Sequence, residues 1–137
     1  MPIEVNFVAV ILAAVASMIL GFLWYSDVLF GKQWRHLMGW THESMEHAKK
    51  KGMTRVYVWG FIFELVTAYV LAHFLILAEV ANVGGLKALV FWAWLGFMLP
   101  VLAGSVLWEN KSLKLLVINA LYRLLALFVM GAVILYV

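Results

Sequence analysis

The side chains that could do chemistry in this sequence are few, and three of them stand inside long apolar runs. Glu64, His73 and Arg123 are ionisable, and an ionisable residue inside a membrane-spanning helix costs about 2.5–3.5 kcal/mol on insertion scales. Such a residue therefore normally faces a partner or a cavity. A carboxylate coupled to a guanidinium is suited to binding a proton, an ion or a small charged solute. It is also suited to holding two helices in register.

The positions of Glu64 and Arg123 within their apolar runs place them at similar depths. Glu64 lies seven residues beyond Tyr57, which is about 10 Å along a helix that rises 1.5 Å per residue. Arg123 lies eight residues beyond Leu115, or about 12 Å. Because both helices are predicted to run in the same direction, an ion pair between the two is geometrically possible. With polar neighbours at matching depth, the predicted intramembrane polar layer is Ser17, Glu64, Thr67, Asn119 and Arg123.

The histidines do not combine into a cofactor or metal site. His73 follows Glu64 by nine residues, which places it on the opposite side of the same helix. It is therefore a separate polar site that could bond across helices, ligate a cofactor or contact a partner. A haem held by two histidines would need a second one nearby, but His36, His42 and His47 all fall in a loop. We expect no cofactor and no metal.

The amino-acid composition indicates an integral membrane protein. Of its 137 residues 66% are hydrophobic and 12% are charged, and the mean hydropathy is +1.01, whereas soluble domains are about one-quarter charged. The sequence has no cysteine, which excludes disulfides, thiol nucleophiles and thiolate-bound metals. Without a nucleophile or a metal cluster we expect no enzyme. The net charge of +3 is interpreted as setting membrane orientation, with no nucleic-acid partner.

Four apolar segments are long enough to cross a bilayer, which needs about 20 residues. The predicted spans are residues 7–24, 57–77, 88–108 and 115–137. Amphipathic aromatic rings favour the headgroup region, and they stand near the ends of these runs: Trp24, Tyr57, Trp108 and Tyr136. Residues 1–6 contain no Lys or Arg, so the first span is predicted to be retained rather than cleaved as a signal peptide. The whole chain is interpreted as one transmembrane domain, residues 1–137.

The basic residues indicate how the spans are oriented. Most of them lie in loop one, residues 25–56, with two more around loop three at Lys111 and Lys114. By the positive-inside bias, loops one and three face the cytoplasm and both termini lie outside. Loop one is predicted to hold two short helices, an amphipathic one over residues 27–38 and one from Thr41 to Gly52. The predicted fold is all-α, an integral membrane four-helix up-and-down bundle with a short amphipathic helical cytoplasmic loop, in the cell inner (plasma) membrane.

Small residues indicate where helices approach closely. The first span carries Ala9, Ala13, Ser17 and Gly21 at four-residue intervals, and the third carries Gly96 and Gly104 around Pro100. Such stripes let another backbone come near, and they could either close the bundle or form a dimer face. Pro100 removes the donor for the carbonyl of Gly96 and is predicted to kink the third span. A freed carbonyl beside a polar layer is also a feature of transporter ion sites.

One motif resembles a known family. The run from Gly21 to Trp34 ends the first span with a Trp-Tyr-Ser, Phe-Gly-Lys and Trp pattern, and its members are Trp24, Tyr25, Ser26, Phe30, Gly31, Lys32 and Trp34. It resembles domain-of-unknown-function family 1761, small bacterial four-helix membrane proteins. The likeness continues through residues 38–39, 68–73, 95–97 and 115–122, with an Ile118-Asn119-Ala120 core. Arg123 departs from the pattern, which more usually has an uncharged residue there, and the resemblance implies no activity.

These observations favour a non-catalytic membrane protein, a structural or accessory component of a homo-oligomer or larger membrane complex whose first partner is the lipid bilayer. Packing stripes and interfacial aromatics are plentiful, and catalytic constellations are absent from the sequence. The alternative is an oligomeric small-solute or proton-coupled transporter that uses Glu64 and Arg123. Four helices in 137 residues enclose little volume, so this alternative also requires more than one copy.

Overall fold

The computed structural model describes residues 4–137, and these residues form helices and connections with no strand. The helices are α1 (Phe7–Trp24), α2 (Gly31–Leu37), α3 (His42–Lys51), α4 (Thr54–Leu77), α5 (Val83–Ala93), the π-helix η1 (Trp94–Met98), α6 (Leu99–Trp108) and α7 (Leu113–Tyr136). Four stretches are long and apolar enough to cross a membrane: α1, α4, the continuous α5–η1–α6 unit, and α7. The predicted all-α fold with four spans is confirmed.

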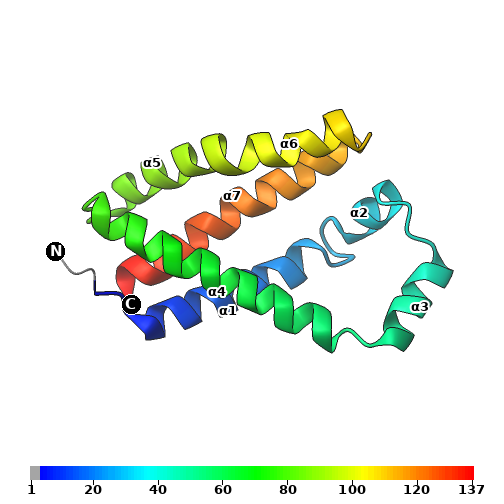
Figure 1. Ribbon diagram of the computed structural model, residues 1–137, viewed down its shortest axis with the longest axis horizontal. Coiled ribbons are helices and arrows are strands. Elements are labelled where there is room, and N and C mark those ends of the chain that lie inside the picture. The colour runs from blue at the N-terminus through cyan, green and yellow to red at the C-terminus, as the bar shows by residue number, and fades with distance from the viewer. Residues whose placement is uncertain (1–3) are drawn as a thin grey trace.

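The four spans run alternately up and down (Figure 1). α1 begins, and α7 ends, at one end of the bundle, and the α2–α3 segment and the connection between α6 and α7 lie at the other. Loops one and three therefore share one end, as the sequence predicted. Three spans start earlier than predicted, because α4 begins at Thr54, the third span begins at Val83 and α7 begins at Leu113.

Side-chain caps fix where several of these helices begin. The side chains of Asn6, Thr41, Asn82 and Ser112 each accept a hydrogen bond from a backbone N–H in the first turn of the helix that follows. A cap of this kind satisfies one of the N–H groups that a helix start leaves unpaired. Thr41 caps the second loop helix, α3, and forms a reciprocal capping box with Ser44.

Loop one contains two helices, but the first is shorter than predicted. α2 begins at Gly31 rather than near residue 27, since residues 26–30 form turns instead. Asp27 lies before α2 and pairs with Arg35, and this hydrogen bond holds the pKa of the Asp27 carboxyl below its usual value. α3 ends at Lys51 with Gly52 at a φ of +86°, a conformation that favours glycine.

The core lies between α1, α4 and α7, and two side chains of α5, Leu86 and Val90, are buried in it. The stripe of small residues on α1 faces it: Ala9, Ala13 and Ser17 are completely buried. At Gly21, an added Cβ would come within 2.8 Å of the Tyr122 hydroxyl oxygen on α7. The α1 stripe therefore closes the bundle from within and is not a dimer face.

The third span is held more loosely. Within its most apolar stretch only 6% of the residues are buried, against 28% in α1 and in α4 and 39% in α7. A Cβ at Gly96 would meet nothing within 4 Å, and Pro100 is exposed. Gly96 and Pro100 therefore lie on a face that points away from the other helices, whereas Gly104 is half-buried. Of the two alternatives for this stripe, closure of the bundle does not apply to Gly96 and Pro100.

The predicted distortion near Pro100 takes the form of a π-helical segment. Pro100 lies in the first turn of α6, and the five residues Trp94–Met98 before it are π-helical. A proline provides no N–H for the preceding turn, and a wider i→i+5 turn accommodates the lost bond. The helix thus continues through the irregularity from Val83 to Trp108.

Candidate functional site

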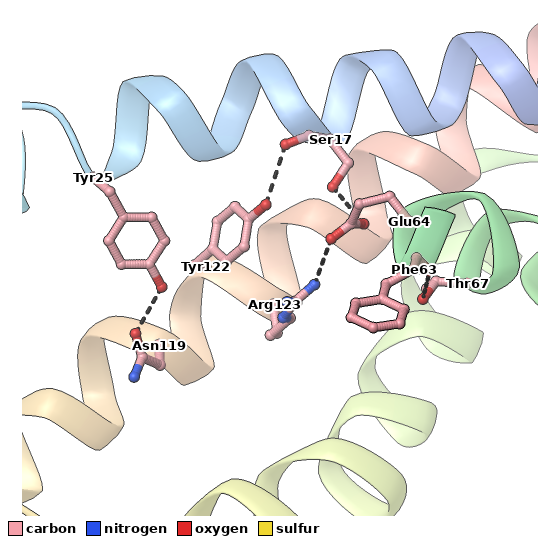
Figure 2. A network of polar contacts seen from close by, with 8 residues as sticks. All are labelled: Ser17, Tyr25, Phe63, Glu64, Thr67, Asn119, Tyr122 and Arg123. Carbon is pink, nitrogen blue, oxygen red and sulfur yellow. Dashed lines mark hydrogen bonds and ion pairs between the residues drawn. The ribbon is translucent and has the colours of Figure 1, made fainter. Parts of the chain in front are cut away.

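A buried carboxylate occupies the centre of the bundle. Glu64 on α4 has a side chain that is 7% exposed, and its Oε1 accepts a hydrogen bond of 2.8 Å from Nη1 of Arg123 on α7. Its Oε2 accepts another of 2.8 Å from the hydroxyl of Ser17 on α1. Figure 2 shows the three side chains converging from three helices. The structure therefore places the predicted ion pair of Glu64 and Arg123 within one chain.

The pair sits at the middle of the membrane-spanning helices. Glu64 follows the first residue of α4, Thr54, by ten positions, and Arg123 follows the first residue of α7, Leu113, by ten positions. Ten residues correspond to about 15 Å of helix, half the thickness of a typical hydrocarbon core. Both side chains therefore lie near the middle of their helices, at matching positions.

A tyrosine that the sequence reading did not select completes this site. The hydroxyl of Tyr122 donates to the backbone carbonyl of Ser17 over 3.1 Å, and the Tyr122 residue is buried. Its ring centroid lies 5.2 Å from the guanidinium carbon of Arg123. Gly21 on α1 leaves the space that the hydroxyl fills. We call Ser17, Glu64, Tyr122 and Arg123 the midmembrane site.

Two predicted members of the polar layer lie outside the midmembrane site. The Thr67 hydroxyl donates to the carbonyl of Phe63, one turn back on its own helix, because a threonine in a helix readily bonds to that carbonyl. Asn119 accepts a 2.7 Å hydrogen bond from the hydroxyl of Tyr25. The five predicted residues therefore do not form one hydrogen-bonded network. Ser17, Glu64 and Arg123 are bonded together, and Asn119 belongs to a second polar group (Figure 2).

The second polar group joins the end of α1 to α7. Burial raises the pKa of Tyr25 to about 12, so its hydroxyl stays protonated and donates to Asn119 at neutral pH. Beside it, the indole N–H of Trp24 donates to the carbonyl of Ile118 over 3.1 Å. From η1, the indole N–H of Trp94 donates to the carbonyl of Ala120 over 2.8 Å. Three aromatic donors thus bind three consecutive residues of α7.

This arrangement changes the interpretation of the Trp24 to Trp34 motif. Trp24 was expected to mark the headgroup region, but it is half-buried and packs with Phe30 and Tyr122. The Tyr25 ring contacts Trp34 edge to face, with centroids 5.5 Å apart. The motif therefore connects α1, α2 and α7. The sequence did not predict these contacts, because tryptophan and tyrosine are typical both of the membrane interface and of buried N–H or O–H donors.

His73 is separate from the midmembrane site, as predicted. Its Nδ1 lies 2.9 Å from the carbonyl oxygen of Tyr69, and its ring contacts the Tyr69 ring at 4.5 Å. Both contacts lie within α4. Across residues 4–137, the histidine, aspartate and glutamate side chains form no group of three that could hold a metal ion.

The midmembrane site joins three helices through a paired charge. Each carboxylate oxygen of Glu64 has one donor, so the charge is paired and hydrogen-bonded as a buried charge requires. A groove of about 260 Å³ begins one turn further along, where Thr67 and Leu127 are among its lining residues. Its walls are almost wholly apolar. The Arg123 side chain is 39% exposed, so the arginine is the accessible member of the pair.

Removal of the Tyr122 hydroxyl tests whether this bond stabilises the bundle. We expect Tyr122→Phe to lower the free energy of unfolding in detergent by about 1 kcal/mol, because the Ser17 carbonyl loses one partner. The matched control is Tyr57→Phe, since Tyr57 is exposed, and this variant should unfold like the wild type. Equal stability of the two variants in a denaturant titration would contradict the role assigned to Tyr122.

Comparison with known proteins identifies one family. A family model described as Protein of unknown function (DUF1761) matches residues 8–135, which covers nearly all of the four spans. No curated protein and no solved structure matches the chain. The resemblance expected from the Trp24 to Trp34 motif and from the Ile118-Asn119-Ala120 core is confirmed. The hydrogen bonds from Trp24 and Tyr25 show that these two parts of the pattern contact each other.

Proposed function

Because this chain belongs to the family described as Protein of unknown function (DUF1761), we propose its role from its own geometry. It is a non-catalytic integral membrane protein that acts as a structural or accessory component of a homo-oligomer or larger membrane assembly. The observation that carries this proposal is the third span. Val83–Trp108 buries 6% of its most apolar stretch, and Gly96 and Pro100 on it face outward.

The packing of helices in membranes explains why this observation supports a partner. Lipid tails are as apolar as leucine, so helices associate through close van der Waals contact, and small residues permit it. A second helix laid against the Gly96 face would gain contacts that lipid gives less well. Phe97 and Val101 beside it are 71% and 75% exposed, and they would supply the apolar rim of such a contact.

The partly exposed guanidinium of Arg123 also supports an assembly. Its side chain is 39% exposed at the depth where hydrocarbon surrounds the bundle, and charged groups at this depth normally face protein or a cavity. A neighbouring subunit would shield the guanidinium from lipid. Many kinds of protein could shield the Arg123 guanidinium, so this observation does not select a partner. The exposed face of the third span remains the primary argument.

Disulfide crosslinking tests this proposal cleanly, because the sequence has no natural cysteine. We expect single variants Phe97→Cys and Val101→Cys to form an adduct of defined mass on oxidation in native membranes. The control Ile19→Cys stands on α1, where Ile19 is 62% exposed, and should remain uncrosslinked. Absence of any adduct from the third span, together with a lone monomer in mild detergent, would overturn the proposal.

A second candidate function, proposed because of the midmembrane position of the ion pair, is an oligomeric small-solute or proton-coupled transporter. Substrate and ion sites of transporters lie near the bilayer midplane, which is where Glu64 and Arg123 sit. The variant Glu64→Gln discriminates between the candidates. A transporter should lose uptake or proton coupling while its fold remains intact, whereas a structural pair should lose stability with no transport to lose.

We also propose that the end carrying α2, α3 and the connection between α6 and α7 faces the cytoplasm of a bacterial inner membrane, with both termini outside. The support is the concentration of Lys and Arg at this end. An impermeant thiol reagent applied to intact cells should spare Val28→Cys, at an 83% exposed position in loop one. Labelling of this cysteine before lysis would reverse the orientation.

A further inference from the structure

A pocket of about 510 Å³ lies where α2 crosses the first turns of α7. Its walls come from both helices: Gln33, His36, Leu37, Leu113, Lys114, Val117 and Ile118. Lys114 is the second residue of α7, so the pocket is at the level where the spanning helix leaves the hydrocarbon. The first turns of α7 lie at the opposite end of that helix from the C-terminus (Figure 1). Ile118 in the pocket wall is four residues, about one helical turn, before Tyr122 of the midmembrane site.

The pocket exists because the chain after α1 turns sharply and brings α2 against α7. The N–H of Phe30 donates to the carbonyl of Trp24, and the N–H of Gly31 donates to the carbonyl of Ser26 over 2.8 Å. A Cβ at Gly31 would lie 2.4 Å from the carbonyl oxygen of Tyr25, so only glycine fits this turn. The family motif therefore fixes the position of α2 against α7.

The walls of the pocket combine hydrogen-bond donors with an apolar floor. Lys114 offers an ammonium group with three donors, Gln33 offers amide donors and His36 offers a ring nitrogen. No acidic residue lines the pocket. Below these groups the floor is aliphatic, and it continues along α7 through Val117 and Leu121, which are 49% and 44% exposed.

We propose that this pocket binds an anionic phospholipid, with the phosphate at Lys114, Gln33 and His36 and one acyl chain along Val117 and Leu121. Charge complementarity selects a negatively charged headgroup, since basic pockets between membrane helices bind such headgroups. The apolar strip selects a lipid over a soluble phosphate compound, because a soluble ligand would leave that strip unused. This inference is independent of the proposed assembly.

The test measures lipid binding to the purified, delipidated full chain by native mass spectrometry, with phosphatidylglycerol as the anionic probe and phosphatidylcholine as the zwitterionic one. We expect phosphatidylglycerol to bind more tightly to the wild type. Lys114→Gln should weaken phosphatidylglycerol binding about fivefold, as expected for the loss of one lysine at a membrane surface. Binding of phosphatidylcholine should change little.

The matched control is Lys111→Gln. Lys111 stands three residues before Lys114 and does not line the pocket, so this variant removes the same charge from outside the site. It should leave phosphatidylglycerol binding nearly unchanged. A second variant, Val117→Trp, adds bulk at a half-exposed position and should reduce binding without removing charge. Equal losses from the Lys111 and Lys114 variants would overturn the proposal in favour of diffuse attraction. Competition by inorganic phosphate as effective as by the lipid would also overturn it.

Discussion

Replacement of Glu64 by leucine should lower the free energy of unfolding by about 3 kcal/mol. Removing one partner of a buried ion pair costs about 3–5 kcal/mol, because the other charge is left without compensation. Here Arg123 would remain at mid-height with no carboxylate, and the Ser17 hydroxyl would lose its acceptor. We place the effect at the lower end because the Arg123 side chain is 39% exposed and retains some freedom to reorient. Equilibrium unfolding in mixed detergent micelles would measure it.

The double variant Glu64→Leu/Arg123→Leu separates pairing from packing. Replacement of both members of a buried pair by apolar residues is often neutral or stabilising, so the double variant should recover most of the stability lost in Glu64→Leu. The conservative Glu64→Gln keeps an acceptor for Ser17 and should fall between the wild type and Glu64→Leu. If the double variant is less stable than Glu64→Leu by the full effect of Arg123→Leu alone, the two residues are not energetically coupled.

Substitution of Gly31 by alanine should be similarly damaging, at about 3 kcal/mol. The added Cβ would lie 2.4 Å from the carbonyl oxygen of Tyr25 and 2.7 Å from the carbonyl carbon of Ser26. Overpacking costs about 1–3 kcal/mol, and the upper end applies here because backbone atoms cannot rotate away as a side chain can. The turn would have to open, so the contact between Tyr25 and Asn119 would be lost with it.

Gly96→Ala provides the comparison for Gly31→Ala, because a Cβ at Gly96 meets nothing within 4 Å. Its effect on the unfolding of the monomer should stay within about 0.5 kcal/mol, as is usual for surface substitutions. Thermal unfolding in detergent would compare the two variants directly. Equal melting temperatures for Gly31→Ala and Gly96→Ala would show that the turn after α1 tolerates a side chain.

The four spans and the matching depth of Glu64 and Arg123 could be predicted from the sequence, because both depend on residue counts along a helix. Helix rise and bilayer thickness are constants, so counting residues locates four spans and places Glu64 and Arg123 at one depth. The high cost of an unpaired charge in lipid then predicts that they meet. The helix starts were less predictable, because capping by Asn82 and polar residues such as Arg55 extend a helix beyond its apolar run.

The rest of the site depends on helix rotation and on local bonding alternatives. Thr67 has an acceptor on its own helix at Phe63, so its depth in the membrane did not determine its partner. Tyr122 fits inside the bundle because Gly21 on the facing helix leaves room for its hydroxyl. This is a relation between distant residues that spacing along one helix does not contain. Residue type alone also could not distinguish the inward stripe on α1 from the outward face at Gly96.

The distances along the chain within the midmembrane site have a consequence for synthesis. Ser17 precedes Glu64 by 47 residues, but Arg123 follows it by 59. At about 5–20 residues per second, the ribosome completes Arg123 roughly 3–12 s after Glu64. We therefore expect each nascent chain to pass through an interval in which α1 and α4 are inserted and the carboxylate has only the serine. A chain that stops before α7 lacks Arg123, so its Glu64 carboxylate stays without its ion-pair partner. The state of Glu64 therefore differs between a complete chain and one truncated before α7.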